Sequence, residues 1–324
     1  MKKVERSKIV RLSRRREKRR LNSLKRRCNR RLGFVAKGLP LFFAPDRLCL
    51  TTHFDELTRL VTKLRSSAEK GFVLSFSRTV KAVADGTLFL HSELDRLSLI
   101  RRKIRFRQSR NQIVNHVLTH LGVLQTSSKY VSRRADIVGW HTGRGTDVDS
   151  EAANKPGESL WSRFPRTVRS RVIGAMNEAL SNVKWAYNSE LLNSGWRTYW
   201  RSETNAVCFA IADRGVGIPK SLPKTMPEIF ADVGRKIIGG VRDAELISAA
   251  LTSNRTASDE AHRGKGLPEM AALLEQWPNA QMTIYSNCGK VLIQRKLGKT
   301  TETKTNSRNS ILGTLVIWKI ETGN

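Results

Sequence analysis

The feature that most limits how this chain can fold is a block of positive charge at its N-terminal end. Residues 1–31 hold sixteen Lys or Arg residues against Glu5 and Glu17, a net charge of +14 out of +31 for the whole chain. A segment with so few apolar residues cannot bury a core. We therefore expect residues 1–45 to form a basic arm that is disordered, or helical when it is bound to phosphates.

The charge of the arm points to a polyanion as partner. A positive field of this size attracts nucleic acid or a ribonucleoprotein, and arginines on phosphates position a protein without reading sequence. The alternative is a solvated tail with only weak affinity. The residues expected to contact phosphates are Arg14, Arg15, Arg16, Arg19, Arg20, Lys25, Arg26 and Arg27.

The remaining chain is long enough for about two domains. It has no apolar run of about 18 residues, so we expect neither a membrane-spanning helix nor a secretory signal. The four cysteines stand far apart without a CxxC pair, which argues against a zinc site or a disulfide framework and favours the cytoplasm. They are Cys28, Cys49, Cys208 and Cys288.

Residues 46–126 predict a small α/β domain with a partly parallel sheet, because helical and strand-like segments alternate. Helices are expected over 54–64, 87–97 and 113–124, and strands over 72–76 and 104–106. Residues 127–158 are polar and rich in Gly, Ser and Asp, which predicts a linker or an irregular connection.

Residues 159–324 predict an α+β two-layer sandwich, with helices beside an antiparallel sheet. Asn287-Cys288-Gly289 is a plausible hairpin turn between two of the strands. Trp185, Trp196 and Trp200 cluster around the expected end of the long helix, where core packing is favoured over base stacking. The expected helices are 166–191 and 267–276, and the expected strands are 206–212, 281–286, 290–296 and 312–320.

Three motifs in this C-terminal part carry chemistry. Glu178 and Asn182 are four residues apart on the long helix and share one face, which suits a water-activating base beside a ligand for a hard metal. Asp213 ends an apolar strand and is followed by Gly215 and Gly217, so an acceptor lies beside a loop that can approach a flat base or a phosphate.

The third motif is Gly264-Lys265-Gly266-Leu267-Pro268, in which glycines lead into a helix with proline in its first turn. The free amides at that helix start could cradle a phosphate. The spacing is neither that of a Walker A loop nor that of a Rossmann fingerprint.

Together and in this order, the three motifs resemble the GHKL ATP-binding fold of gyrase, the heat-shock chaperone, histidine kinases and mismatch-repair ATPases. The resemblance covers residues 160–320 and implies ATP and Mg²⁺ as cofactors. It implies that Glu178 activates water, that Asn182 ligates Mg²⁺, that Asp213 binds the adenine amine together with Thr314, and that residues 220–262 form a mobile lid. Gly215, Gly217, Gly264, Lys265, Gly266 and Leu267 would then line the nucleotide.

Two departures from the family's pattern reduce the number of activities that we expect. None of the six histidines is followed by an acidic residue, so phosphorylation on histidine is disfavoured. The further domain of gyrase-like members, which supplies a lysine to the γ-phosphate, is not expected here.

The N-terminal part carries a fainter resemblance. Residues 72–86 resemble part of a STAS domain of anti-sigma antagonists, with Asp85 near the position of the family's phosphorylated serine. There it would give a fixed negative charge at a helix start, which stabilises that helix slightly.

These observations lead to three functional hypotheses. The first is an Mg²⁺-dependent ATP-binding and ATP-hydrolysing switch that controls an unidentified protein partner, with the arm on nucleic acid. The second is an anti-sigma-type serine protein kinase. The third is a nucleic-acid-binding accessory protein with a structural nucleotide site. A bacterial or mobile-element origin would suit this combination, and the sequence leaves a homodimer open.

Overall fold

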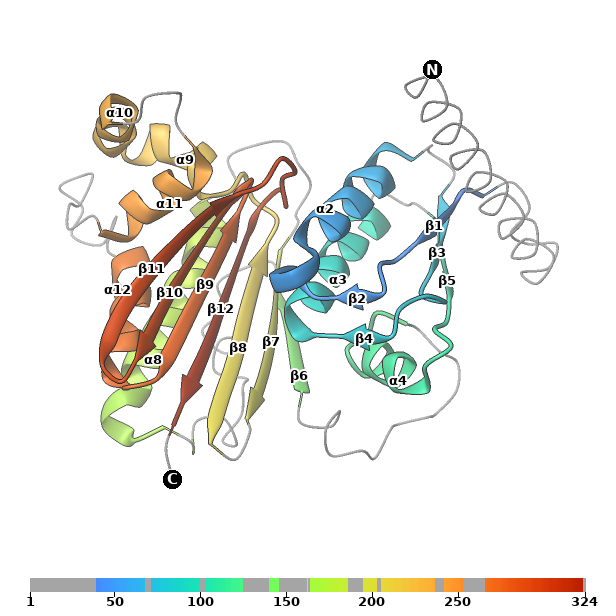
Figure 1. Ribbon diagram of the computed structural model, residues 1–324, viewed down its shortest axis with the longest axis horizontal. Helices are drawn as coiled ribbons and strands as arrows, with labels where there is room; N and C mark the ends of the chain where they lie inside the picture. The colour runs from blue at the N-terminus through green and yellow to red at the C-terminus, as the bar shows by residue number, and fades with distance from the viewer. Residues whose placement is uncertain are drawn as a thin grey trace, which may run out of the picture.

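A computed structural model of the protein describes residues 39–67, 71–99, 103–124, 140–145, 162, 164–185, 195–202, 205–236, 242–252 and 266–322. The basic residues Arg14 to Arg27 lie outside these ranges. The described residues form one large antiparallel sheet, a helical layer on one of its faces, and a smaller α/β unit on the other (Figure 1).

The large sheet has seven strands among the described residues, in the order β11-β10-β9-β12-β8-β7-β6, and every neighbouring pair is antiparallel. The strand that follows these others along the chain, β12, lies at the centre of the sheet. The strands are β6 (Trp140–Gly145), β7 (Trp196–Ser202), β8 (Ala206–Asp213), β9 (Ala280–Ser286), β10 (Gly289–Lys296), β11 (Lys299–Asn306) and β12 (Thr314–Glu321).

One face of the sheet is covered by α8 (Arg166–Trp185), α11 (Asp243–Thr252) and α12 (Gly266–Ala272), which continues into a 3₁₀ turn over Leu273–Gln276. Val172, Met176 and Ala179 recur at helical spacing along α8 and bury against Phe209 and Trp318 of the sheet. Two more helices, α9 (Ile218–Thr225) and α10 (Pro227–Lys236), pack beside α11 in a smaller cluster.

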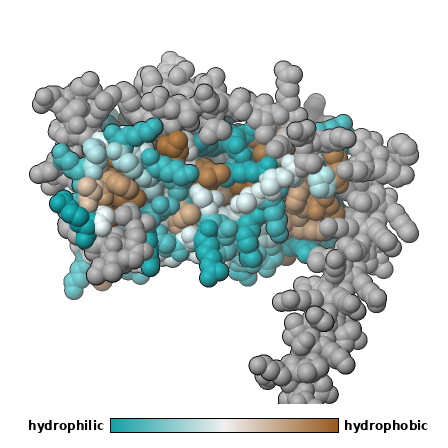
Figure 2. Space-filling view, turned by 90° about the horizontal axis from the view of Figure 1, so that it is seen from above, coloured by the Kyte–Doolittle hydropathy of each residue, from teal (hydrophilic) through white to brown (hydrophobic). Residues whose placement is uncertain are grey.

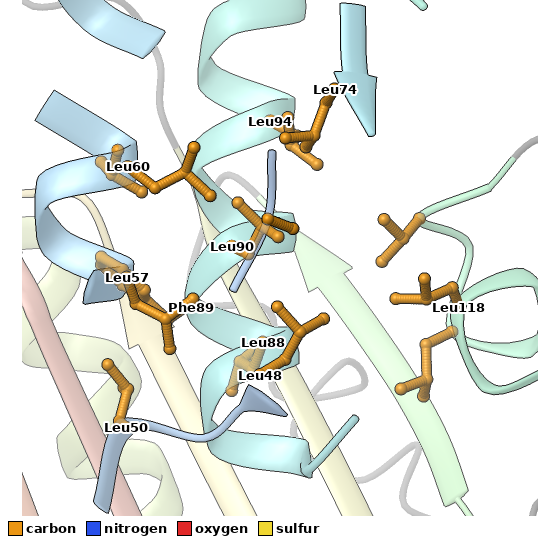
Figure 3. Packing of buried hydrophobic residues seen from close by; sticks show 14 of the residues in the cluster. Leu48, Leu50, Leu57, Leu60, Leu74, Leu88, Phe89, Leu90, Leu94 and Leu118 are labelled. Carbon is orange, nitrogen blue, oxygen red and sulfur yellow. The ribbon is translucent and has the colours of Figure 1, made fainter. Parts of the chain in front are cut away.

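The opposite face is covered by the N-terminal unit, through its helices α2 (Leu50–Ser66) and α3 (Ala84–Leu99). Figure 3 shows Leu57 and Leu60 of α2 beside Phe89 of α3, with Leu74 and Leu118 on the far side of α3. Tyr199, Tyr285 and Leu315 of the large sheet bury in the same core. The large sheet is therefore apolar on both faces, and the two units share a core.

The N-terminal unit also contains a three-stranded sheet in the order β1-β3-β5, with parallel pairs, and a two-stranded pair of β2 and β4. Its remaining elements are β1 (Leu41–Phe43), β2 (Arg47–Leu48), β3 (Phe72–Ser75), β4 (Lys81–Ala82), β5 (Ile104–Arg107) and α4 (Gln112–His120). The parallel pairing confirms the α/β character predicted for this part, and the described residues as a whole mix helices and sheets in a way that is compatible with the α+β class.

Two boundary predictions are wrong. The predicted arm, residues 1–45, includes β1, which pairs with β3 because its apolar side chains pack into the N-terminal unit. The predicted linker, residues 127–158, includes β6, which pairs with β7. Gly145 is needed there, since a Cβ at this position would lie 2.5 Å from the Trp196 ring.

Two further interpretations need correction. Trp196 and Trp200 lie in β7 and not at a helix end. Both side chains are buried, so they belong to the core, which the sequence favoured over base stacking. The lid implied over residues 220–262 cannot include α11, because Ala244, Ile247 and Leu251 belong to the main core. No helix of the described residues is both long and apolar enough to cross a bilayer.

Candidate functional site

The candidate site lies at one end of the large sheet, where three polar side chains form a single cross-strand row. Asp213 ends β8, Thr314 begins β12 and Ser286 ends β9, and the three are register partners. Because side chains alternate along a strand, all three point to the helix-covered face, like Ile211 two residues before Asp213. In Figure 1 this end of the sheet is at the top.

Hydrogen bonds join the row. The Thr314 and Ser286 hydroxyl oxygens are 3.0 Å apart, and both the amide and the hydroxyl of Thr314 bond to the Asp213 carboxylate. The amide of Gly215 donates to Asp213 Oδ1 at 2.7 Å. These donors hold the carboxylate in one orientation at the edge of the core.

Burial raises the pKa of Asp213 to about 6, against the lowering effect of its hydrogen bonds and of the Arg214 charge. The group is therefore still mostly ionised at pH 7, but it is poorly solvated. A poorly solvated carboxylate gains most from a ligand that brings a further N–H donor.

The loop after Asp213 is shaped by Gly217, which has a φ of +84°. A Cβ there would lie 2.6 Å from Asn287 Nδ2, so only glycine fits this backbone. The amide of Ile218, the first residue of α9, donates to Ser286 Oγ at 2.8 Å. The glycine loop is thus tied to the polar row.

Helices α8 and α12 pack against each other on the helix-covered face of the sheet. Glu178 of α8 lies against Gly266, where a Cβ would come within 2.5 Å of Glu178 Oε2. This contact brings residues of the first and third motifs next to each other. Leu267 is half-buried and packs against the main core.

Three residues of the predicted nucleotide site cannot be placed fully. Asn182 belongs to α8, one turn after Glu178, but its side chain is outside the described part of the structure. Gly264 and Lys265 lie outside the described residues altogether. The phosphate-cradle and metal-ligand predictions for these residues stay predictions.

Two residues of the site were not predicted from the sequence. Ser286 accepts the Ile218 amide, and Asn287 donates from Nδ2 to the carbonyl of Val216 at 3.0 Å. Asn287 has a φ of 49° and stands in the two-residue turn between β9 and β10. The signal was the turn itself: β8 and β9 run in the same direction, so the turn after β9 and the glycine loop after β8 meet at one end.

A second polar cluster lies in the N-terminal unit, around Asp85. Its carboxylate accepts hydrogen bonds from the amides of Leu50 and Thr51, at 3.1 and 3.2 Å, and therefore caps α2. The expected role at the start of its own helix is thus only part of its function. Burial raises the pKa of Asp85.

Asp46, His53 and Glu56 also come together, with His53 Nε2 3.3 Å from Asp46 Oδ1. Asp46 and Glu56 are exposed, and the contact is accounted for by an ion pair.

Comparison with family models and with curated proteins found no match for this chain. The functional argument therefore depends on the geometry of the candidate site and on the sequence motifs.

Proposed function

We propose that this protein binds ATP with Mg²⁺ at the candidate site, in the manner of a GHKL-type ATPase, and uses the nucleotide as a switch. The observation that carries the proposal is the hydrogen-bonded row of Asp213, Thr314 and Ser286, which the Ile218 amide ties to the glycine loop at Gly217. A buried carboxylate beside hydroxyls and open backbone suits a flat base that bears an amine.

The residues suit the group in three further respects. Asp213 lacks solvation and would accept from the adenine amine. Gly217 gives the loop after Asp213 a backbone with positive φ, and Gly266 lets the start of α12 approach Glu178 closely. Asn182 would ligate the Mg²⁺, which stabilises charge on the transferred phosphoryl group.

Glu178 favours hydrolysis over simple binding. Its carboxylate lies against the start of α12, where the attacking water would stand, and such a group acts as general base. A site that only binds nucleotide has no need of a carboxylate at this place. A serine kinase would place the hydroxyl of a partner protein where the water stands.

The adenine assignment is tested with Asp213→Asn. The amide would turn a donor toward the adenine amine in a buried site, which costs about 1–3 kcal/mol and lowers ATP affinity about 5- to 150-fold. Asp46→Asn, an exposed change of the same chemistry, is the control. Calorimetric titration measures both, and equal ATP affinity in the two variants would sink the assignment.

The hydrolysis assignment is tested with Glu178→Gln. We expect ATP binding to remain and turnover to fall by about 10²- to 10⁴-fold, because a general base acts on the reaction and not on the bound ground state. Glu269→Gln, on the exposed side of α12, is the matched control. Parental turnover in Glu178→Gln would leave this carboxylate without a role in hydrolysis.

Labelled ATP separates the hypotheses. Free phosphate supports the ATPase, label on a partner protein supports the kinase, and neither product supports a structural nucleotide site.

A further inference from the structure

Helix α3 of the N-terminal unit lies directly behind the ends of the strands that form the candidate site. A small, partly open hollow of about 10 Å³ lies between them. Phe89, Ser92 and Glu93 line it from α3, and Asp213, Arg214 and Thr314 line it from the sheet. The N-terminal unit therefore forms the rear wall of the site.

A first link runs from Arg214 to Asp95. Since Asp213 points to the helix-covered face, the next residue, Arg214, points to the opposite face, toward α3. Arg214 Nη2 is 3.6 Å from Asp95 Oδ2, and its side chain is only 7% exposed. Asp95 also accepts a hydrogen bond from Arg197 Nε of β7 at 2.9 Å. One carboxylate of α3 thus pairs with two buried guanidinium groups of the sheet.

A second link runs from Glu93 through Arg65 to the other loop of the site. Glu93 is almost fully buried and accepts hydrogen bonds from Arg65 Nε and Nη2 at 2.9 and 2.5 Å. The same Arg65 Nη2 donates to the carbonyl of Ile311, in the loop that leads to Thr314, at 3.3 Å. The amide of Ile311 in turn donates to the carbonyl of Asn287.

The first link ends on the Arg214 side chain and the second on the carbonyl of Ile311, and the loops that carry these two residues border the polar row. Arg214 is part of the glycine loop, and Ile311 precedes Gly313, whose φ is +125° and whose Cβ would lie 2.4 Å from the Asp213 carbonyl oxygen. A displacement of α3 would therefore move both loops of the site together.

We infer that Asp95 and Glu93 are positioning residues for the nucleotide site, and that the N-terminal unit and the nucleotide are thermodynamically coupled through them. This inference rests on the proposed function. Coupling is reciprocal: if α3 holds the loops in the binding geometry, a bound nucleotide must tighten the packing of α3 on the sheet. The N-terminal unit then reports the nucleotide state to whatever it contacts.

The test is a double-mutant cycle on ATP affinity with Asp95→Asn, Arg214→Gln and the double variant. Each single change is expected to weaken ATP binding about tenfold, and the double variant by about the same factor, because the two residues act as one link. Glu56→Gln, an exposed carboxylate of α2, is expected to bind like the parent. Parental affinity in the single variants, or effects that multiply in the double variant, would overturn the inference.

Hydrogen exchange in the parent protein gives a second readout that does not need a variant to fold. We expect amides of residues 84–99 to exchange more slowly with Mg·ATP than without it, although α3 covers the face opposite the nucleotide. Unchanged exchange in a protein that binds ATP contradicts the coupling alone. Absence of ATP binding to the parent protein contradicts the proposed function instead.

Discussion

Asp213 lies where burial disfavours the ionised form of its carboxyl group. A buried carboxylate with a pKa near 6 stabilises the fold less when ionised than when protonated, yet the proposed ligand needs the ionised acceptor. Local cost of this kind is common at functional sites, because stability there is exchanged for binding. The row of hydroxyls and amides around Asp213 limits the cost without removing it.

The pH dependence of stability should show this cost. The pKa of Asp213 is raised from 3.8 to about 6 in the folded protein, so the folded state holds the proton more tightly than the unfolded state. The contribution of Asp213 to the free energy of unfolding is therefore fully present below pH 3.8 and is lost as the pH rises through 6. We therefore expect the thermal midpoint of the parent to rise relative to that of Asp213→Asn when both are measured at decreasing pH from 7.5 to 5.

The comparison of variants cancels groups that titrate in both proteins. His91, whose pKa burial and the nearby Arg197 lower to about 3, acts in the opposite direction, since its contribution is fully present above pH 6.5 and is lost progressively as the pH falls from there toward 3. ATP affinity of the parent should decline over the interval in which Asp213 gains its proton. Parallel midpoint curves for the two proteins would contradict the assignment of this carboxyl group.

Residue types and local spacing were enough to nominate Glu178, Asp213 and Gly266 as candidate site residues, because each stands in a motif with its own neighbours. The Arg214–Asp95 link could not be found in this way. Its partners are more than a hundred residues apart, and only the packing of α3 on the sheet brings them together. The local hint was the Asp213-Arg214 pair at a strand end, which must point to opposite faces.

Helices α8 and α12 each contain a glycine, and the two glycines differ in what surrounds them. At Gly174 of α8, the position that a Cβ would occupy has no atom within 4 Å, whereas a Cβ at Gly266 of α12 would meet Glu178. The first glycine is therefore dispensable to packing, and the second is required by it.

Alanine substitutions should separate the two positions. Gly174→Ala is expected to raise the free energy of unfolding by about 0.5–1 kcal/mol, because alanine loses less backbone entropy in a helix. Gly266→Ala is expected to lower it or to displace Glu178, so that ATP turnover falls. Denaturant titration and phosphate release measure the pair, and equal stability changes at both sites would contradict the close approach of Glu178 to Gly266.

Elements with a clear apolar period were predicted well, and elements without one were missed. The long helix and strands β9, β10 and β12 follow their hydrophobic pattern, and the turn at Asn287-Cys288 is confirmed. Strand β11 has every residue exposed, so it has no alternation to detect, and Leu297 and Gly298 with φ of 47° and 77° form the turn that pairs it with β10.

The property of the whole molecule that bears most on its partners is its net charge of +31. Figure 2 shows the upper end of the molecule, where hydrophilic surface separates several small hydrophobic patches among the coloured residues. Residues 1–31 hold +14 of the net charge of +31, so the rest of the chain keeps +17. We therefore expect nucleic-acid contact to depend on residues 1–31 and nucleotide binding to be independent of them.

Deletion of residues 1–31 tests this division. Binding to RNA or DNA should weaken, and the slope of log affinity against log salt should decrease by roughly 0.7–0.9 for each phosphate that the arm no longer neutralises. ATP affinity and the thermal midpoint should hardly change, because the deleted segment precedes every strand and helix of the described core. Identical salt slopes for full-length and truncated protein would assign the charge to an acidic protein partner.

Because β12 lies at the centre of the large sheet, this sheet cannot form fully until β12 has been added. The other described strands of the large sheet leave the ribosome before it, yet β9 and β8 have no direct pairing and meet only through β12. Until β12 inserts, the nascent sheet consists of two separate ribbons with open edges, and Asp213 and Ser286 belong to different ones. Synthesis, refolding and quality control of this protein should therefore all be sensitive to this strand, because its insertion joins the two halves and brings the candidate site together in the same event.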